Sequence, residues 1–361
     1  MTKIRAAICH EFGQPLTVET VELRAPGPGE VEVTLDACAI CQSDISYIDG
    51  GWGGELPAVY GHEAAGRVSA LGPGVTGYAP GQKVLVTLIR ACGRCPPCAG
   101  GRAVLCADPA MPGSPLTLLD GRALEQGLKT GAFAEKVVVD RSQLAPLPDG
   151  IPMEAASLLS CGAITGIGAA VNTARIRPGE VVVVIGAGGV GLNAIQGARL
   201  AGAARIIAVD MVPEKLDAAR EFGATDGVLA SEEKPWSAAK RLAGRGADAV
   251  LVTVGAIPAY DTATRYLGPG GRMVAVGMPH SGASSSYEPV ILAATGQIME
   301  GSLMGDTVLA RDIPWMTDLY LQGRLKLDEL ISGRWSLDQI NEAIADTRTG
   351  AARRNVIAFG D

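Results

Sequence analysis

The segment from residue 181 to residue 210 limits the fold more than any other part of the chain. It reads VVVVIGAGGVGLNAIQGARLAGAARIIAVD: an apolar run, a glycine-rich turn, a helical stretch and a second apolar run. A strand that ends in G-x-G-x-x-G and leads into a helix is the pattern of a dinucleotide-binding βαβ unit. Later apolar runs, ADAVLVTVG and GRMVAVGMP, also alternate with helical stretches, which indicates a buried parallel sheet.

Each glycine of the motif has its own physical task. Gly186 permits the tight turn, Gly188 lets the backbone approach a pyrophosphate, and Gly191 allows helix and strand to pack closely. Gly189 and Val190 complete the predicted loop, where the helix N-terminus offers free N–H groups to phosphates. We therefore expect a dinucleotide at this turn.

Asp210 ends the second apolar run, about 20 residues beyond the glycines. A carboxylate at this place hydrogen-bonds the ribose hydroxyls and repels a 2′-phosphate, which favours NAD over NADP. The alternative is that Asp210 only caps the helix that follows it.

Length and composition indicate two domains. The chain has 361 residues and 47% hydrophobic content, which is enough for two cores. Residues 1–160 read as short β segments between Gly/Pro turns, with a barrel-like pattern, whereas residues 161–300 carry the alternating strands and helices. Residues 301–361 are expected to complete the first domain. The predicted class is α/β, a mostly β domain joined to a doubly wound parallel sheet.

Charge and hydropathy argue against several partners. The net charge is −7, from 31 basic and 38 acidic residues without a basic block, so nucleic acid and anionic membranes are not expected. The chain lacks a run of about 18 apolar residues, and its N-terminus, MTKIRAAICHEFG, lacks an apolar signal core. We expect a cytoplasmic protein, in which cysteines are more often metal ligands or catalytic groups than disulfides.

Four of the eight cysteines lie in one loop, ACGRCPPCAGGRAVLC. Cys92, Cys95, Cys98 and Cys106 follow the spacing C-x2-C-x2-C-x7-C. Four thiolates can close a tetrahedron around one zinc ion and leave no open position, so we expect a structural site. The alternatives are a disulfide pair and an iron–sulfur cluster, which also uses short C-x2-C runs.

The remaining thiols and the three histidines are scattered along the chain. Cys41, His62 and Cys161 stand in CAICQSD, YGHEAAG and LLSCGAITGIG. Alone, a buried cysteine is usually an inert small hydrophobe. If these three residues meet, two thiolates and one imidazole make a catalytic zinc site with an open fourth position. The spacing alone does not decide between these readings.

At these residues the chain resembles the zinc-dependent medium-chain alcohol dehydrogenases over essentially its whole length. The resemblance is carried by GHEAAGRVSALGPGV, the four-cysteine loop, LLSCGAITGIGAA and the segment 181–210. It implies a GroES-like catalytic domain, a Rossmann domain, NAD and two zinc ions per chain, one catalytic and one structural. In NTARI, GAFAEKVVV and LYLQGRL the chain resembles the class III-like bacterial branch of S-(hydroxymethyl)mycothiol and other formaldehyde-adduct dehydrogenases.

The resemblance implies a metal-site role for five residues. Cys41, His62 and Cys161 would ligate the catalytic zinc. Glu63 would lie behind the metal as a transient ligand, and Asp44 would accept a hydrogen bond from the histidine.

It also implies contacts with the coenzyme. Lys215 would assist at the ribose, Thr165 would abut the nicotinamide, and Arg354 would reach the pyrophosphate. Val254 and Val276 would complete the coenzyme site.

Two positions depart from the family pattern. Where the family often has a basic residue directly after the first zinc cysteine, this chain has Gln42, which should weaken NAD binding. Ser43 would hydrogen-bond the alcohol and pass its proton on. The family often ends this relay with a histidine, and this chain has Ser46 at that position. A serine can pass a proton through water but cannot hold it near neutral pH.

The implied reaction is the reversible oxidation of primary or aromatic alcohols to aldehydes with hydride transfer to NAD. The alternatives are the same chemistry on an S-(hydroxymethyl)thiol and reduction of a C=C or C=N bond on the same fold. The resemblance implies a homodimer or homotetramer joined through the nucleotide-binding sheets. Leu88, Trp52 and Met278 are expected to line the substrate pocket.

Overall fold

The computed structural model describes residues 1–108 and 113–360. They form two compact units. The first contains Met1–Cys161 and the carboxyl-terminal segment from Val308 onward, and the second is Gly162–Thr307. The sequence-based boundaries fall near residues 160 and 300.

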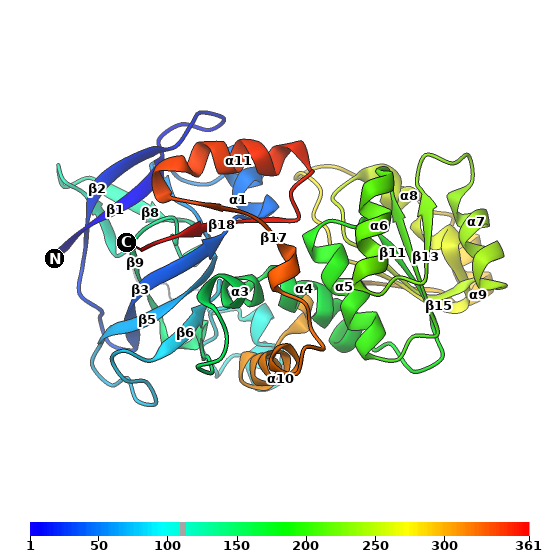
Figure 1. Cartoon of the computed structure of the whole chain (residues 1–361), viewed down its shortest axis with the longest axis horizontal. Coiled ribbons are helices and arrows are strands. Elements are labelled where there is room, and N and C mark those ends of the chain that lie inside the picture. Colours follow the sequence, from blue (N-terminus) through cyan, green and yellow to red (C-terminus); the bar gives the residue numbers. More distant parts are fainter. Residues whose placement is uncertain (109–112, 361) are drawn as a thin grey trace. The chain divides into compact units, whose positions relative to one another are not determined.

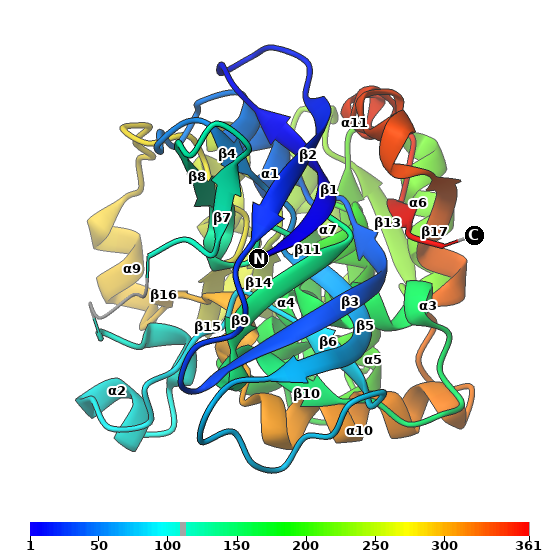
Figure 2. The same cartoon turned by 90° about the vertical axis from the view of Figure 1, so that its left-hand side faces the viewer.

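Short strands between glycine and proline turns build the first unit. Its strands are β1 (Thr2–Cys9), β2 (Thr17–Leu23), β3 (Glu30–Ala39), β4 (Ala58–Val59), β5 (Glu63–Leu71), β6 (Lys83–Val86), β7 (Leu116–Leu118), β8 (Ala123–Gln126), β9 (Lys136–Asp140), β10 (Leu144–Pro146), β17 (Ile331–Trp335) and β18 (Arg354–Ala358). Strands β1, β2, β7, β8 and β4 close a small barrel (Figure 2). The other strands form a sheet in the order β10-β6-β5-β3-β18-β17, and β9 also pairs with β3.

The carboxyl-terminal strand is part of the same core as the amino-terminal strands. In Figure 1, β18 lies beside β17, and Val356 of β18 pairs with Ala39 of β3 in antiparallel register. Ile357 belongs to one buried apolar cluster with Val33 and Leu35 of β3. The helices of this unit are α1 (Gln42–Ile48), α2 (Pro96–Ala99), α3 (Met153–Ser157), α10 (Leu309–Leu321) and α11 (Ile340–Thr349).

The second unit, all of which the structure describes, contains a parallel sheet of six strands. These are β11 (Val181–Ile185), β12 (Arg205–Asp210), β13 (Asp226–Leu229), β14 (Ala247–Val252), β15 (Leu267–Ala275) and β16 (Ile298–Gly301). The helices are α4 (Gly162–Gly168), α5 (Gly189–Leu200), α6 (Pro213–Phe222), α7 (Pro235–Ala243), α8 (Ile257–Tyr266) and α9 (Pro289–Thr295). Figure 1 shows α5 and α6 on one face of the sheet and α7 and α9 on the other.

The strand order of this sheet positions the glycine turn. The order is β13-β12-β11-β14-β15-β16, so the chain moves outward in one direction from β11 and then in the other from β14. Ligands of doubly wound sheets bind at the carboxyl ends of the strands where this reversal occurs. The predicted class, a mostly β unit with a doubly wound parallel sheet, is confirmed.

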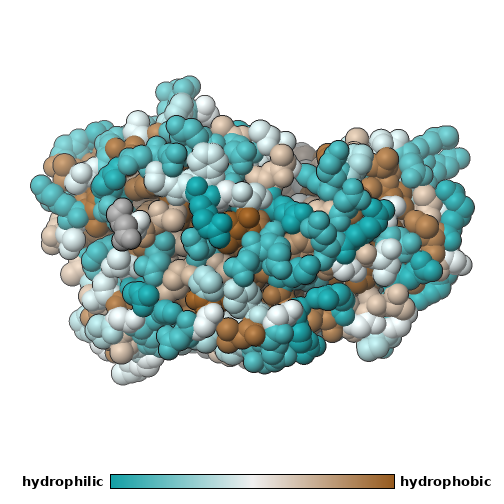
Figure 3. Space-filling model, in the orientation of Figure 1, coloured by the Kyte–Doolittle hydropathy of each residue, from teal (hydrophilic) through white to brown (hydrophobic). Residues whose placement is uncertain are grey.

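Within residues 1–108 and 113–360, the structure contains no single helix that is long and apolar enough to cross a membrane. The bent pair of Met153–Ser160 and Gly162–Thr173 reaches such a length and apolar content only when its two parts are taken together. The face in Figure 3 is mostly hydrophilic or neutral, with hydrophobic residues in small groups.

Candidate metal and nucleotide sites

Three segments of the first unit bring together Cys41, His62, Glu63 and Cys161. Cys41 lies between β3 and α1, and the pairing of Ala39 with Glu63 places the start of β5 beside it. Cys161 follows the 3₁₀ turn Leu158–Ser160. One potential ligand atom from each of the four side chains lies within 4.8 Å of the others, and all four side chains are buried. Segments far apart in the sequence therefore converge on one point.

Asp44, the third residue of α1, organises this group through its carboxylate. Its Oδ2 accepts a hydrogen bond from the Cys41 backbone N–H at 3.0 Å, and its Oδ1 accepts one from Gly61 N–H at 3.0 Å. The same Oδ1 lies 2.9 Å from His62 Nδ1. Because the carboxylate accepts a hydrogen bond from Nδ1–H, this contact orients the ring and leaves the lone pair on Nε2 available.

The resulting donor set fits a zinc ion. His62 Nε2 is buried and has no hydrogen-bond partner, and an unsatisfied buried polar atom is costly unless another group, such as a metal ion, satisfies it. The hydrogen bond from Cys161 lowers the pKa of the Cys41 thiol well below its usual value, and contact with His62 acts in the same direction against burial. Two sulfurs and one imidazole nitrogen are ligands that zinc prefers.

Glu63 stands beside this set and is fully buried. Arg354 Nη1, at the start of β18, lies 3.2 Å from Glu63 Oε1 and donates a hydrogen bond to the Ile40 carbonyl at 3.2 Å. Neither oxygen of Glu63 has hydrogen-bond geometry to a donor. Burial raises the pKa of Glu63 to about 8, although the charge of Arg354 opposes this shift. The predicted contact of Arg354 with a pyrophosphate stays a prediction.

The serines of the predicted proton relay both lie in α1. Ser43 and Ser46 are half-buried and three residues apart, so they share one side of the helix. The nearby Trp52 contacts Tyr47 edge-on, with ring centroids 5.2 Å apart. Leu88, like Trp52, is half-buried.

The four-cysteine loop forms a second cluster in the first unit. The sulfurs of Cys92, Cys95, Cys98 and Cys106 all lie within 4.8 Å of one another and are partly exposed. The eight cysteines are free thiols, and all of them lie in described parts of the chain. The backbone N–H of Ala107 lowers the pKa of Cys95, whereas burial raises the pKa of Cys98 to about 12.

The glycine turn after β11 has the local geometry that the sequence predicted. Gly186 has φ +97°, and a Cβ there would lie 2.3 Å from Val254 Cγ1. A Cβ on Gly191 would lie 1.9 Å from the Gly186 oxygen, so helix and strand pack closely at this point. A Cβ on Gly188 would meet nothing within 4 Å. The open space above Gly188 fits the approach of a pyrophosphate to the backbone.

Asp210, at the end of β12, connects two turns. Its Oδ2 accepts a hydrogen bond from Ala187 N–H in the glycine turn at 2.7 Å, and its Oδ1 accepts one from Val212 N–H at 3.1 Å. The second bond closes a short turn before α6, whose N-cap is Val212 without a side-chain cap, so Asp210 does not cap this helix. A carboxylate has about four lone-pair sites, so capacity remains for ribose hydroxyls.

The sequence analysis missed Thr253, which supports the same turn. Its Oγ1 lies 2.9 Å from the Gly186 carbonyl oxygen and 3.0 Å from that of Ile185. The available signal was its place directly after the apolar run ADAVLV, at the carboxyl end of β14 next to β11.

The other predicted coenzyme contacts also lie in the second unit. Lys215 is half-buried in the first turn of α6, and Val254 follows β14. Val276 follows β15 and is 9% exposed. The Thr165 hydroxyl in α4 lies 3.7 Å from the sulfur of Met304.

Comparison with known proteins identifies the family. Residues 27–149 match the alcohol dehydrogenase GroES-like domain, and residues 189–322 match the zinc-binding dehydrogenase family. The NDMA-dependent alcohol dehydrogenase of Amycolatopsis methanolica is 36% identical over 377 residues, covering 98% of this chain and 98% of that protein. The chain belongs to the zinc-binding alcohol dehydrogenase family.

Solved structures agree with this membership. An alcohol dehydrogenase zinc-binding domain protein from Burkholderia ambifaria has a TM-score of 0.95 at 33% identity, with both chains covered over 100%. Benzyl alcohol dehydrogenase from Acinetobacter calcoaceticus has a TM-score of 0.94 at 29% identity and the same coverage. The predicted family, with its GroES-like and Rossmann parts, is confirmed, whereas the class III-like branch stays a prediction.

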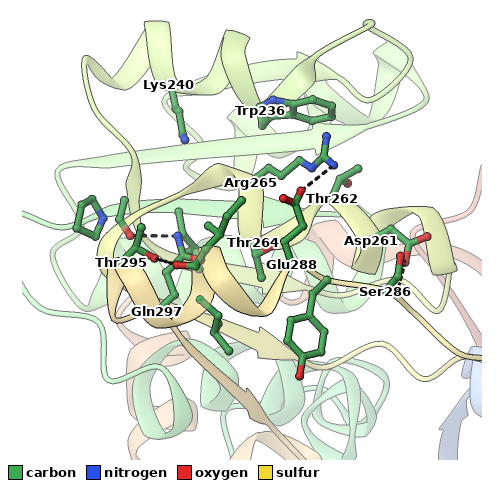
Figure 4. Close-up of a pocket in the computed structure, with 16 residues that line it drawn as sticks. Trp236, Lys240, Asp261, Thr262, Thr264, Arg265, Ser286, Glu288, Thr295 and Gln297 are labelled. Carbon is green, nitrogen blue, oxygen red and sulfur yellow. Dashed lines mark hydrogen bonds and ion pairs between the residues drawn. The ribbon is translucent and has the colours of Figure 1, made fainter.

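One cavity of this dehydrogenase lies in the second unit, away from the glycine turn. It has a volume of about 840 Å³ and is formed by α7, α8, α9 and the start of β15 in the second unit (Figure 4). In it, Arg265 lies 5.1 Å from the centre of the Trp236 ring and 3.6 Å from Glu288. The cavity is at the amino end of β15, whereas the glycine turn is at the carboxyl end of β11. Met278, expected in the substrate pocket, does not line this cavity and is 59% exposed.

Proposed function

We propose that this chain reversibly oxidises primary or aromatic alcohols to aldehydes with zinc and NAD. The supporting observation is the buried group of Cys41, His62 and Cys161, in which Nε2 lacks a partner. Zinc supplies a Lewis acid that lowers the pKa of an alcohol hydroxyl, and NAD supplies the hydride acceptor.

The protein's own side chains orient these partners. Asp44 holds the ring of His62 through Nδ1, which leaves Nε2 available to bind zinc together with the two cysteines. Ser43 would hydrogen-bond the alcohol oxygen and accept its proton while giving up its own hydroxyl proton. Ser46, on the same side of α1, would pass that proton through water to the solvent. Glu63, beside His62, would act as a transient ligand of the catalytic zinc.

We assign NAD rather than NADP because of the carboxylate of Asp210, which also holds the turn at Ala187. That negative charge is unfavourable for a 2′-phosphate. The relative from A. methanolica is named NDMA-dependent, so the electron acceptor must be tested directly.

We infer that the four-cysteine cluster holds a second, structural zinc. Its four sulfurs would fill a tetrahedral site and leave no position for substrate. An iron–sulfur cluster is the alternative outcome of a metal analysis.

We further propose that two copies associate along β16. This strand ends the order of its sheet, so one side of its backbone lacks a neighbouring strand within the described unit. Its residues Ile298 and Met299 are 54% and 41% exposed, and Val290 nearby is 72% exposed. An open strand edge with apolar side chains favours pairing with another strand. A monomer in sedimentation experiments on the wild-type protein would contradict this association.

The deciding experiment combines a metal count with an activity panel. We expect two zinc ions per chain and oxidation of primary or benzylic alcohols with NAD. The panel includes NADP, NDMA and a formaldehyde–thiol adduct, so that acceptor and substrate class are separated. Wild-type turnover by a folded Cys161→Ala variant would refute the proposed metal site.

A further inference from the structure

Ser160, the residue before Cys161, is held by two buried hydroxyl groups, its own and that of Thr87. The Ser160 carbonyl accepts a hydrogen bond from Thr87 Oγ1 at 2.6 Å. The Ser160 Oγ donates to the Ala64 carbonyl at 2.9 Å. All three residues are fully buried. Neither Thr87 nor Ser160 is a proposed metal ligand, and the sequence pattern predicts no role for either hydroxyl.

These bonds act on the two segments that carry the metal ligands. The Ser160 carbonyl and the Cys161 N–H belong to one rigid peptide plane, so fixing the oxygen fixes the plane that leads to the Cys161 Cα. Ala64 directly follows Glu63 and His62 at the start of β5. Ser160 is therefore held to β5 by its side chain and to Thr87 by its backbone.

Thr87 is itself fixed from the other side. Its backbone N–H donates to the Gln143 carbonyl at 3.0 Å, and Gln143 Nε2 donates to the Thr87 carbonyl at 2.9 Å. Gln143 Nε2 also donates to the Lys129 carbonyl at 3.0 Å. Because the neighbouring backbone holds Thr87, its hydroxyl is a fixed donor rather than one that follows Ser160.

We propose that Thr87 and Ser160 are positioning residues, which hold Cys161 where it can complete the metal site with Cys41 and His62. This inference rests on the metal site of the proposed function. A buried hydroxyl is unfavourable unless it is hydrogen-bonded, so an apolar side chain would serve a purely packing role better. Residues behind metal ligands typically change metal affinity by about 10–100-fold when replaced.

The test uses zinc-loaded protein and measures metal release to a chelating indicator dye. Thr87→Val removes the hydroxyl at nearly constant shape, Ser160→Ala removes the second bond, and Thr87→Ser restores the donor. Matched controls are Ser157→Ala and Thr130→Val, because both hydroxyls are in buried residues and donate to backbone carbonyls, those of Glu154 at 2.7 Å and Leu128 at 3.0 Å.

The release phase that Cys161→Ser abolishes belongs to the site under test. We expect Thr87→Val and Ser160→Ala to accelerate this phase about 10–100-fold and to leave the other phase unchanged. After cobalt substitution, the thiolate-to-cobalt absorption should shift in both variants and return in Thr87→Ser. The two controls should release metal at the wild-type rate.

Unchanged release and absorption in a folded Thr87→Val or Ser160→Ala protein would overturn the inference. An equal acceleration in Thr130→Val would also overturn it, because the effect would then be general loosening. If Thr87→Val does not fold, Ser160→Ala and Thr87→Ser decide the question. Wild-type protein with no metal in the Cys161-dependent phase would instead overturn the proposed metal site itself.

Discussion

Replacing Asp44 by Asn tests whether this carboxylate organises the metal site. In the wild type it accepts hydrogen bonds from Cys41 N–H, Gly61 N–H and His62 Nδ1, at 2.9–3.0 Å and without exposure to solvent. The amide oxygen of Asn can keep the bonds to Gly61 and His62. Its NH2 group then faces the Cys41 N–H, donor against donor.

The magnitude follows from this geometry. One buried donor left without an acceptor costs about 1–3 kcal/mol, and loss of the charge weakens the two remaining bonds. We therefore expect Asp44→Asn to lower the free energy of unfolding by about 1–3 kcal/mol. Because the ring of His62 loses its charged partner, zinc affinity at this site should fall about 10–100-fold.

Chelator competition on the purified protein measures zinc affinity, and urea denaturation measures stability. Asp312→Asn is the matched control, because Asp312 is also buried and accepts a backbone N–H, that of Val308 at 2.9 Å, but belongs to α10. It should lose stability and keep zinc affinity. The reasoning fails if Asp44→Asn binds zinc as tightly as the wild type, or if both variants weaken zinc binding equally.

Three further outcomes are expected. Gly188→Ala places a methyl group in open space, so the melting temperature should stay within about 1 °C of the wild type. The affinity for NAD, measured by calorimetry, should fall at least about tenfold, because the methyl group occupies the space of the pyrophosphate. The control Gly113→Ala, also in open space, should change neither quantity. Cys95→Ser should release one metal ion and lower the melting temperature by several degrees, which corresponds to a loss of about 1–3 kcal/mol in the free energy of unfolding. Turnover per folded chain should be preserved. Full stability with lost turnover would contradict the division between a structural and a catalytic metal site. Burial raises the pKa of Glu30, but hydrogen bonds from Arg24 and a backbone N–H bring it below its ordinary 4.5. The pair of Arg24 and Glu30 therefore stabilises the fold above pH 4.5 and less as the pH falls further. Between pH 6 and pH 3.5 the melting temperature of Glu30→Gln should fall less than that of the wild type, and an equal fall would exclude this pair as a cause.

The sequence predicts the second unit better than the first for a physical reason. The glycine turn and Asp210 are local, because strand, turn, helix and strand follow one another between residues 181 and 210. Strands with continuous apolar runs also announce their burial on both faces. Thr253 escaped notice because its role comes from the neighbour of β11 across the sheet, which is a fact of topology.

The metal group depends on contacts between distant segments. Cys41, His62 and Cys161 were linked only through the resemblance to a family, since no spacing brings residue 161 to residue 41. The pairing of β3 with β5 explains the approach of the first two. Thr87 and Ser160 are small hydroxyl residues in apolar surroundings, and the sequence offers no periodicity that would reveal their hydrogen bonds.

The place of β18 has a consequence for the order in which the protein matures during synthesis. Domains generally fold from the amino terminus as the chain is made, but β18 lies between β3 and β17 and contains Arg354, the partner of Glu63. The contiguous residues 162–307 can thus fold first, while Ala37–Ala39 of β3, beyond the part that β9 covers, still lack the strand that is synthesised last. A chain that stops before residue 354 would carry every proposed metal ligand and the whole nucleotide-binding unit, yet it would present an open, aggregation-prone sheet.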